Sequence, residues 1–242
     1  MDESPPLYNS RITKIYIQYL QKYYPDINVD SVLEDLGIAK YEIEDPAHWF
    51  TQDQQDRLHD VLVARTGNPN IAREAGRYAT SSEGLGATKQ YALGLMSPTA
   101  AYQLIEKIYV LMSRGADVSA KKIGTNQVEI TAIPRPGVKE KSYQCENRTG
   151  QFESVARLFT DKLAQIDHPS CVHKGDNCCR YIITWAKSPK THWTLIRNYL
   201  LLVSVIALPI LYFALPYSTW GIVALACAFL TVLVAYCGQH YE

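Results

Sequence analysis

The spacing of apolar residues along the chain predicts helices in its first half and strands in its second. Thr51 with Gln54 forms a capping-box pattern, and Ser97 followed by Pro98 is typical of the start of a helix. Helices are therefore expected over residues 10–24, 31–36, 51–65, 71–78, 85–96 and 98–113. Residues 1–9 are expected to form a flexible leader.

Strand-like segments follow the predicted helices. They cover residues 117–123, 128–133, 141–145, 166–173 and 178–185. One helix is expected among them, over residues 151–164, because Phe152, Val155 and Phe159 recur there at helical spacing. Helices followed by an antiparallel sheet with an embedded helix predict the α+β class, with helices packed on the sheet in one domain over residues 10–186.

The last fifty residues have a different composition, because no charged residue occurs from Asn198 to Gly238. Two apolar runs, about 199–215 and 219–237, would each span roughly 26–29 Å as helices, close to the ~30 Å hydrocarbon core of a bilayer. They predict two transmembrane helices in a hairpin with a short uncharged connection. The alternative is a buried helical hairpin of a soluble core, but no amphipathic face supports it.

Charge sets the expected orientation of this hairpin. The chain has 24 basic and 24 acidic residues, so nothing favours binding to nucleic acid. Lys187, Lys190 and Arg197 precede the first apolar run, in an expected linker over residues 187–197. Because basic residues favour the cytoplasmic side of a membrane, the large N-terminal domain is predicted to be cytoplasmic.

Four cysteines and a histidine offer candidate metal chemistry. The pattern Cys145-x22-His168-x2-Cys171-x7-Cys179 supplies four nitrogen and sulfur ligands, the set that a closed tetrahedral zinc site uses. Strand alternation places Cys179 on the inward face and leaves its neighbour Cys178 on the other. The alternative is that these are small thiols near a turn, with no metal.

The segment HPSCVHKGDNCCRYIITW, residues 168–185, resembles the C-terminal hairpin of 4-vinyl reductase-type small-molecule-binding domains. Such domains occur in phenol- and xylene-responsive bacterial activators and as input modules of membrane-associated sensor kinases and cyclases. Their superfamily includes haem nitric-oxide-binding domains and the TRAPP trafficking subunits. The resemblance covers residues 50–186 and is strongest over 67–79, 122–130 and 145–185.

In the aromatic-responsive relatives a structural zinc is held by Cys, Glu, Cys and Cys at this spacing. The resemblance therefore implies zinc at Cys145, His168, Cys171 and Cys179, with His168 at the position of the carboxylate. Histidine is also a zinc ligand, so this departure changes the charge of the site. The resemblance further implies a homodimer.

A ligand pocket is expected between the helices and the sheet. The candidate lining residues are aromatic and aliphatic: Tyr91, Leu95, Met96, Tyr102, Ile105 and Tyr109. The alternative is that each is an ordinary core residue. Haem-binding relatives need an axial histidine and a Tyr-x-Ser-x-Arg clamp, and the sequence contains no such clamp. The residues that relatives use to hold phenol have no counterpart in this stretch either.

Together these observations predict a sensory or ligand-binding module anchored in a bacterial inner membrane. It would bind a small hydrophobic molecule and signal to a kinase or cyclase output partner. No nucleophile motif or dinucleotide fingerprint is present, so an enzyme is not expected. Two alternatives remain open, a structural adaptor without a small ligand and a reductase acting on a vinyl or tetrapyrrole substrate.

Overall fold

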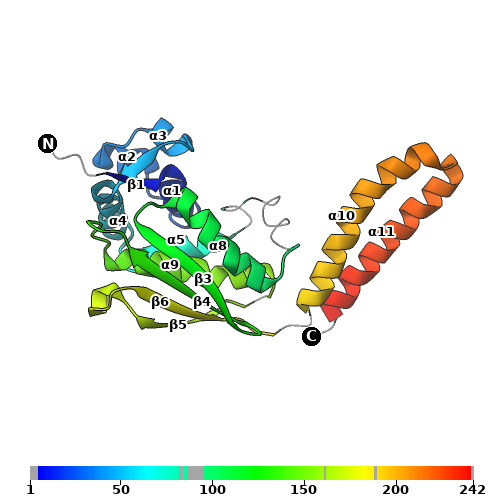
Figure 1. Ribbon diagram of the computed structural model, residues 1–242. Helices are drawn as coiled ribbons and strands as arrows, with labels where there is room; N and C mark the ends of the chain where they lie inside the picture. Colours follow the sequence, from blue (N-terminus) through cyan, green and yellow to red (C-terminus); the bar gives the residue numbers. More distant parts are fainter. Residues whose placement is uncertain are drawn as a thin grey trace.

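The computed structural model describes residues 5–81, 84, 86, 95–160, 162–187 and 190–240. The strands are β1 (Pro6–Asn9), β2 (Trp49–Thr51), β3 (Ala116–Gly124), β4 (Gln127–Pro134), β5 (Gln165–Ser170) and β6 (Cys179–Thr184). The helices are α1 (Ser10–Tyr23), α2 (Val29–Leu36), α3 (Lys40–Glu44), α4 (Gln52–Thr66), α5 (Ile71–Tyr78), α8 (Pro98–Met112), α9 (Ser142–Val155), α10 (Lys190–Ala214) and α11 (Tyr217–His240). Two short 3₁₀ helices are η1 (Ala156–Leu158) and η2 (Val172–Lys174). Figure 1 shows their arrangement.

One four-stranded antiparallel sheet forms the centre of the soluble part, in the order β3-β4-β6-β5. Strand β6 alternates along its length, so that Cys179, Tyr181 and Ile183 are buried while Arg180 is exposed. Helices α8 and α9 cover the buried face: Tyr102 of α8 stacks on Trp185 and donates from its hydroxyl to the Phe152 carbonyl of α9. Helices packed on an antiparallel sheet confirm the predicted α+β class.

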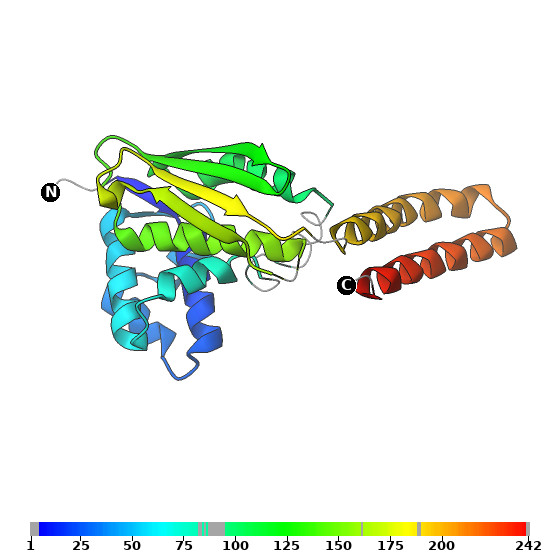
Figure 2. The ribbon, with the colours of Figure 1, turned by 90° about the horizontal axis from the view of Figure 1, so that it is seen from below.

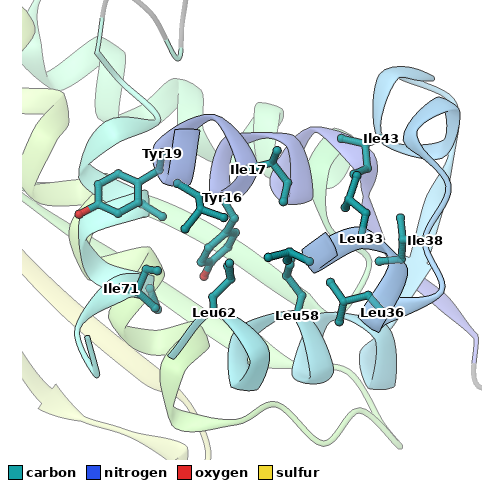
Figure 3. Packing of buried hydrophobic residues seen from close by; sticks show 14 of the residues in the cluster. Tyr16, Ile17, Tyr19, Leu33, Leu36, Ile38, Ile43, Leu58, Leu62 and Ile71 are labelled. Atoms are coloured by element: carbon teal, nitrogen blue, oxygen red, sulfur yellow. The ribbon is translucent and has the colours of Figure 1, made fainter. Parts of the chain in front are cut away.

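A second hydrophobic core lies among the N-terminal helices. Its residues come from α1, α2, α4 and α5 and from the segments beside them, and Figure 3 shows them pointing toward one another: Tyr16, Ile17, Tyr19, Leu33, Leu36, Ile38, Ile43, Leu58, Leu62 and Ile71. The capping box of Thr51 and Gln54 is present at the start of α4, as the sequence predicted. Ser97 likewise caps α8 by accepting a hydrogen bond from the Ala100 amide.

The two cores meet where α5 crosses α9. In Figure 2, α9 lies between the sheet and the N-terminal helices. Gly76 and Gly150 allow the close approach: a Cβ atom would lie 2.2 Å from the Asn147 carbonyl oxygen in the first case and 2.0 Å from the Arg73 carbonyl oxygen in the second. Backbone therefore packs on backbone at this crossing.

Glu153 of α9 adds an ionic link to the same crossing. It is buried, and it accepts hydrogen bonds from Arg73 and from Arg77 of α5, the latter from Nε at 2.6 Å. Burial raises the pKa of Glu153, but the hydrogen bonds and charges of the two arginines outweigh it, and the net pKa lies below the ordinary glutamate value. The carboxylate therefore stabilises the folded state while it is ionised.

The strand predicted over residues 141–145 is wrong, because these residues begin α9 and place Cys145 on a helix. The Gln144 side chain accepts from the Lys141 amide and starts the helix there. The buried positions of its first half include Asn147, Arg148 and Gly150. Polar residues at buried positions conceal helical periodicity, which explains why the prediction began this helix at residue 151.

Two short elements near the N-terminus were also missed. Residues 6–9, expected within a flexible leader, form β1 and pair with β2 in an antiparallel ribbon. Strands of three or four residues are too short to show alternation. Helix α3 covers residues over which the sequence predicted no helix. The helix expected over residues 85–96 lies mostly outside the described residues, and Leu95 and Met96 form a turn before α8.

Helices α10 and α11 form an antiparallel apolar pair. Within them, Leu195–Ala214 and Tyr217–Gly238 are long and apolar enough to cross a membrane. Helix α10 begins at Lys190, so most of the expected linker over residues 187–197 is helical. Trp220 of α11 donates from its indole nitrogen to the Leu208 carbonyl of α10 at 2.9 Å, which ties the two helices together near their connection.

The helix crossing predicts that Gly150→Ala destabilises the domain. The new Cβ atom meets backbone rather than a flexible side chain, so α5 and α9 must separate. We expect a loss of at least about 2 kcal/mol in the free energy of unfolding, measured by thermal circular dichroism on the full chain in detergent. Gly221→Ala is the control, because its Cβ atom would meet nothing within 4 Å. Equal stability of the two variants would contradict the close crossing.

Glu153 gives a second prediction. Glu153→Gln removes the ionised acceptor of two arginines, and we expect a loss of about 2 kcal/mol at pH 7. Because the folded-state pKa is depressed, this contribution is present above the ordinary glutamate pKa of about 4.3 and disappears as the pH falls through the folded-state value. The comparison is Glu146→Gln, which also removes a partner of Arg73 but whose side chain is 51% exposed, so we expect a change within about 0.5 kcal/mol. Similar losses in both variants would rule out the special role of Glu153.

Candidate functional site

Three cysteines converge beneath the inner face of the sheet. Cys145 comes from α9, Cys171 follows β5 directly, and Cys179 is the first residue of β6. Their sulfur atoms all lie within 4.8 Å of one another, with 3.6 Å between Cys145 and Cys179 and 4.0 Å between Cys179 and Cys171. All three are buried as free thiols. We refer to Cys145, Cys171 and Cys179 as the thiol cluster.

A buried arginine lies beside the thiol cluster. Arg148, one turn along α9 from Cys145, is 4% exposed and pairs with Glu140 through two hydrogen bonds of 2.9 and 2.7 Å. Its Nη2 also donates to Cys145 Sγ at 3.5 Å, and its Nε donates to the Tyr181 hydroxyl at 3.4 Å. A guanidinium so deeply buried needs such partners, and the bidentate carboxylate supplies the main compensation. The ion pair thereby fixes a positive charge next to the sulfurs.

The cysteines of the thiol cluster differ in acidity. The hydrogen bond with Cys145, a backbone hydrogen bond at Val172 and the charge of Arg148 together lower the pKa of Cys179 to about 7 despite its burial. The same hydrogen bond, together with burial, raises the pKa of Cys145 to about 12. Either sulfur can donate in this contact, and the pKa directions favour Cys145 as the donor that keeps the shared proton once Cys179 ionises.

His168 does not join the thiol cluster, although the sequence placed it there. Its ring stacks on Tyr181 with 4.2 Å between ring centroids, and its buried Nε2 has no hydrogen-bond partner among the described residues. Burial lowers the pKa of His168, so the ring is neutral at pH 7. The structure therefore brings together three of the four predicted ligands. Cys178 precedes β6 and remains outside the cluster, as the alternation predicted.

The residues predicted to line a ligand pocket are mostly packed. Tyr102 is fully buried, Ile105 packs against the sheet core, and the Tyr109 hydroxyl accepts from Arg148 Nη1 at 3.3 Å. Leu95 and Met96 are partly exposed in the turn before α8, and Tyr91 lies outside the described residues. Fully buried Phe152 and Tyr181 fill the space between α9 and the sheet. In the described part, the candidates on α8 therefore behave as core residues.

The exposed side chains of α8 include polar Gln103 and Lys107. They also include three apolar ones, Ile108, Val110 and Leu111, which are 43%, 52% and 59% exposed. We call these three residues the outer face of α8. A hollow of about 220 Å³ lies elsewhere, among α1, α2 and α3, and its lining includes Lys14, Lys40 and Glu44.

Sequence reasoning missed the polar network that joins the two cores. Tyr143 of α9 donates to Asp56 of α4 at 2.9 Å, and Gln52 donates to Asp56 and to Gln144 at 2.7 and 3.1 Å. The Tyr143–Asp56 and Gln52–Gln144 partners are some ninety residues apart along the chain, and none stands in a recognisable motif. The Arg148–Glu140 pair, although only eight residues apart, likewise stands in no recognisable motif.

Comparison with known proteins shows the fold but no family. No protein-family model matches the sequence, and no curated protein matches it significantly. Among solved structures, an H-NOX protein from S. oneidensis in the Fe(II)NO state is 14% identical, with a TM-score of 0.57 over 74% of this chain and 99% of that one. An oxygen-binding H-NOX domain related to soluble guanylate cyclases is 17% identical, with the same TM-score over 74% of this chain and 95% of that one.

The chain therefore has the fold of the H-NOX domains. The likeness is one of fold alone, and it does not show the predicted 4-vinyl reductase resemblance. It also corrects the expectation of a structural zinc, because the matching solved structures are described as haem proteins or by an Fe(II) ligation state, and not as zinc proteins. The thiol cluster is present without the complete ligand set that the expectation required.

Haem does not fit the described residues. A haem iron needs an axial ligand, most often histidine, that faces a space as large as the macrocycle. His59 lies flat on Tyr143 at 4.1 Å, and His168 lies on Tyr181. His48 packs on Phe50 and lies 3.6 Å from Glu42. Each of these three rings is thus engaged by another aromatic ring, and His173, in η2, is exposed at the surface.

The shared proton of the thiol cluster yields a third prediction. Thiolate absorbance near 240 nm should titrate with a midpoint near pH 7 in the full chain, owing to Cys179. Cys179→Ser should abolish this step, and Cys145→Ala should raise its midpoint by removing the hydrogen-bond donor. Cys178→Ser is the matched control and should leave the step unchanged. An absorbance that stays flat between about pH 6 and pH 8 would show that the cluster does not ionise as described.

Proposed function

We propose that the chain is a membrane-anchored sensory domain that responds to its signal without haem. The observation that carries the proposal is the fold, which spans 95–99% of the length of the H-NOX domains named above and continues directly into two apolar helices. Those domains are described as binding nitric oxide or oxygen at iron. Because the rings of His48, His59 and His168 here pack on other aromatic rings, the proposed input is of another kind.

The membrane anchor is supported by the surface of α10 and α11. Only 6% of each candidate span is buried, and the exposed side chains include Val203, Ile206 and Phe229 at 58–67%. Exposing so much apolar surface to water is unfavourable, whereas the acyl chains of a bilayer would cover it. We therefore assign residues 198–238 to a bacterial inner membrane, with residues 10–186 on its cytoplasmic side, as the basic residues before the hairpin favour.

The proposed signal is a small apolar molecule that binds along α8. The support is the outer face of α8, together with partly exposed Leu95 and Met96 at the start of the helix. Binding there would act on Tyr109, which contacts Arg148, and thus on the helix that joins the two cores. A homodimer and an output partner, a kinase or a cyclase, would transmit the change.

A second candidate function is that of a structural adaptor without a small ligand. The close packing of Tyr102, Phe152 and Tyr181 favours it, because these side chains fill the space where a ligand pocket was expected. In that case the outer face of α8 would contact another protein. The two candidates differ in whether small molecules stabilise the fold.

The test of the proposal is ligand-dependent thermal unfolding of the full chain in detergent. A small apolar compound at a hundred times its Kd should stabilise the domain by about 2.7 kcal/mol. Ile108→Asp should remove the shift, and Tyr41→Asp should retain it, since Tyr41 is also exposed but lies on α3. Haem added under the same conditions should give neither a shift nor a Soret band.

Other outcomes would decide against the proposal in distinct ways. Stoichiometric haem with an axial-ligand spectrum would refute sensing without haem. No shift with any member of a library of apolar compounds would favour the adaptor. A shift that persists in Ile108→Asp would place the binding site away from α8.

A further inference from the structure

One end of the sheet carries a group of exposed basic residues. Lys121 and Lys122 lie near the end of β3, Arg157 lies in η1, Lys162 precedes β5, and Lys187 follows β6; all are exposed. Ile123, 42% exposed, lies between this group and the β3–β4 turn. We call these residues the basic end.

Strand pairing brings these distant segments together. Thr184 of β6 pairs with Gln127 of β4 on one side and with Gln165 of β5 on the other. Just beyond this row, Asn126 of the β3–β4 turn donates from its side chain to the Trp185 carbonyl at 2.6 Å. The β3–β4 turn, the start of β5 and the exit of β6 therefore lie at the same end of the sheet.

Acidic residues balance this charge only in part. Glu129 pairs with Arg180 at 3.0 Å, so its charge is already matched. Asp167 lies two residues into β5 and is exposed, and Asp161 belongs to the sequence beside Lys162. No acidic residue occurs from Asn177 to Tyr241, whereas Lys187, Lys190 and Arg197 do. Every charged residue between the sheet and the apolar helices is therefore basic.

The basic end also lies close to the apolar hairpin. From Trp185 to Lys190 is five residues, and α10 is helical from Lys190 to the start of the candidate span at Leu195. Even a fully extended link keeps these points within about 25 Å of each other. Figures 1 and 2 both show the hairpin following this end of the sheet.

We propose that the basic end docks on anionic lipid headgroups, with Ile123 entering the interface between headgroups and acyl chains. This inference rests on the proposed membrane anchor. Lysines next to a negatively charged leaflet each strengthen binding about fivefold, and an apolar residue among them adds contact with the interface. Docking would hold the soluble domain in one orientation above the membrane.

The test places the full chain in lipid nanodiscs and measures hydrogen exchange in the peptide that contains the β3–β4 turn. With about 30% anionic lipid at low salt, exchange should slow at least about threefold relative to neutral lipid, and the difference should vanish near 0.5 M salt, where the Debye length is short. Lys121→Gln with Lys122→Gln should abolish the difference. Lys139→Gln with Lys174→Gln is the matched control and should retain it, because both lysines are exposed beyond the opposite end of the strands.

Three results would overturn the inference. Exchange that is equal in anionic and neutral nanodiscs, with the chain stably inserted, would refute docking and leave the membrane anchor intact. Equal protection by inorganic phosphate in neutral nanodiscs would show that the basic end binds free anions rather than a lipid surface. A chain that alkaline carbonate washes off the nanodiscs would refute the membrane anchor and the docking together.

Discussion

The backbone contact between α5 and α9 is the constraint on which the rest of the soluble structure depends. Helix α9 packs on the sheet with one side and on α5 with the other, so it belongs to both hydrophobic cores. Gly76 and Gly150 let the two helices touch, and Glu153 holds two arginines of α5 across the contact. Cys145 and Arg148 lie on the same helix. The position of the thiol cluster is therefore fixed by the same crossing that joins the two cores.

Much of the architecture could be predicted from periodicity and capping, because those signals are local. Helix α5 and helix α8 lie at or within one residue of their expected bounds, and β6 alternates as expected. The first half of α9 could not be recognised, because its inward side chains are polar and find partners far away in sequence. Asn147, for example, donates to the Ala72 carbonyl. Such pairing becomes visible only when both helices are in place.

In the candidate site, too, some features could be predicted from the sequence and others could not. The structure brings Cys145, Cys171 and Cys179 together, but it places Cys145 on a helix and not on the predicted strand. The partners of His168 and the ion pair of Arg148 depend on how rings and charges pack, which spacing does not encode. The predicted zinc site included His168 as its fourth ligand, and the structure places His168 outside the thiol cluster. The resemblance of residues 168–185 had already indicated a superfamily that includes haem nitric-oxide-binding domains, and solved structures with that fold match at 14–17% identity.

The hydrogen bond between Trp220 and the Leu208 carbonyl has a mechanical consequence. It lies one residue from Pro209, where the helix lacks an amide donor and would otherwise be able to bend. At the other end of the two helices, Gly238 of α11 packs closely against Trp193 of α10. Fastened at both ends, α10 and α11 resist sliding past each other. A motion of the soluble domain would therefore tilt or rotate the two helices together as one rigid unit.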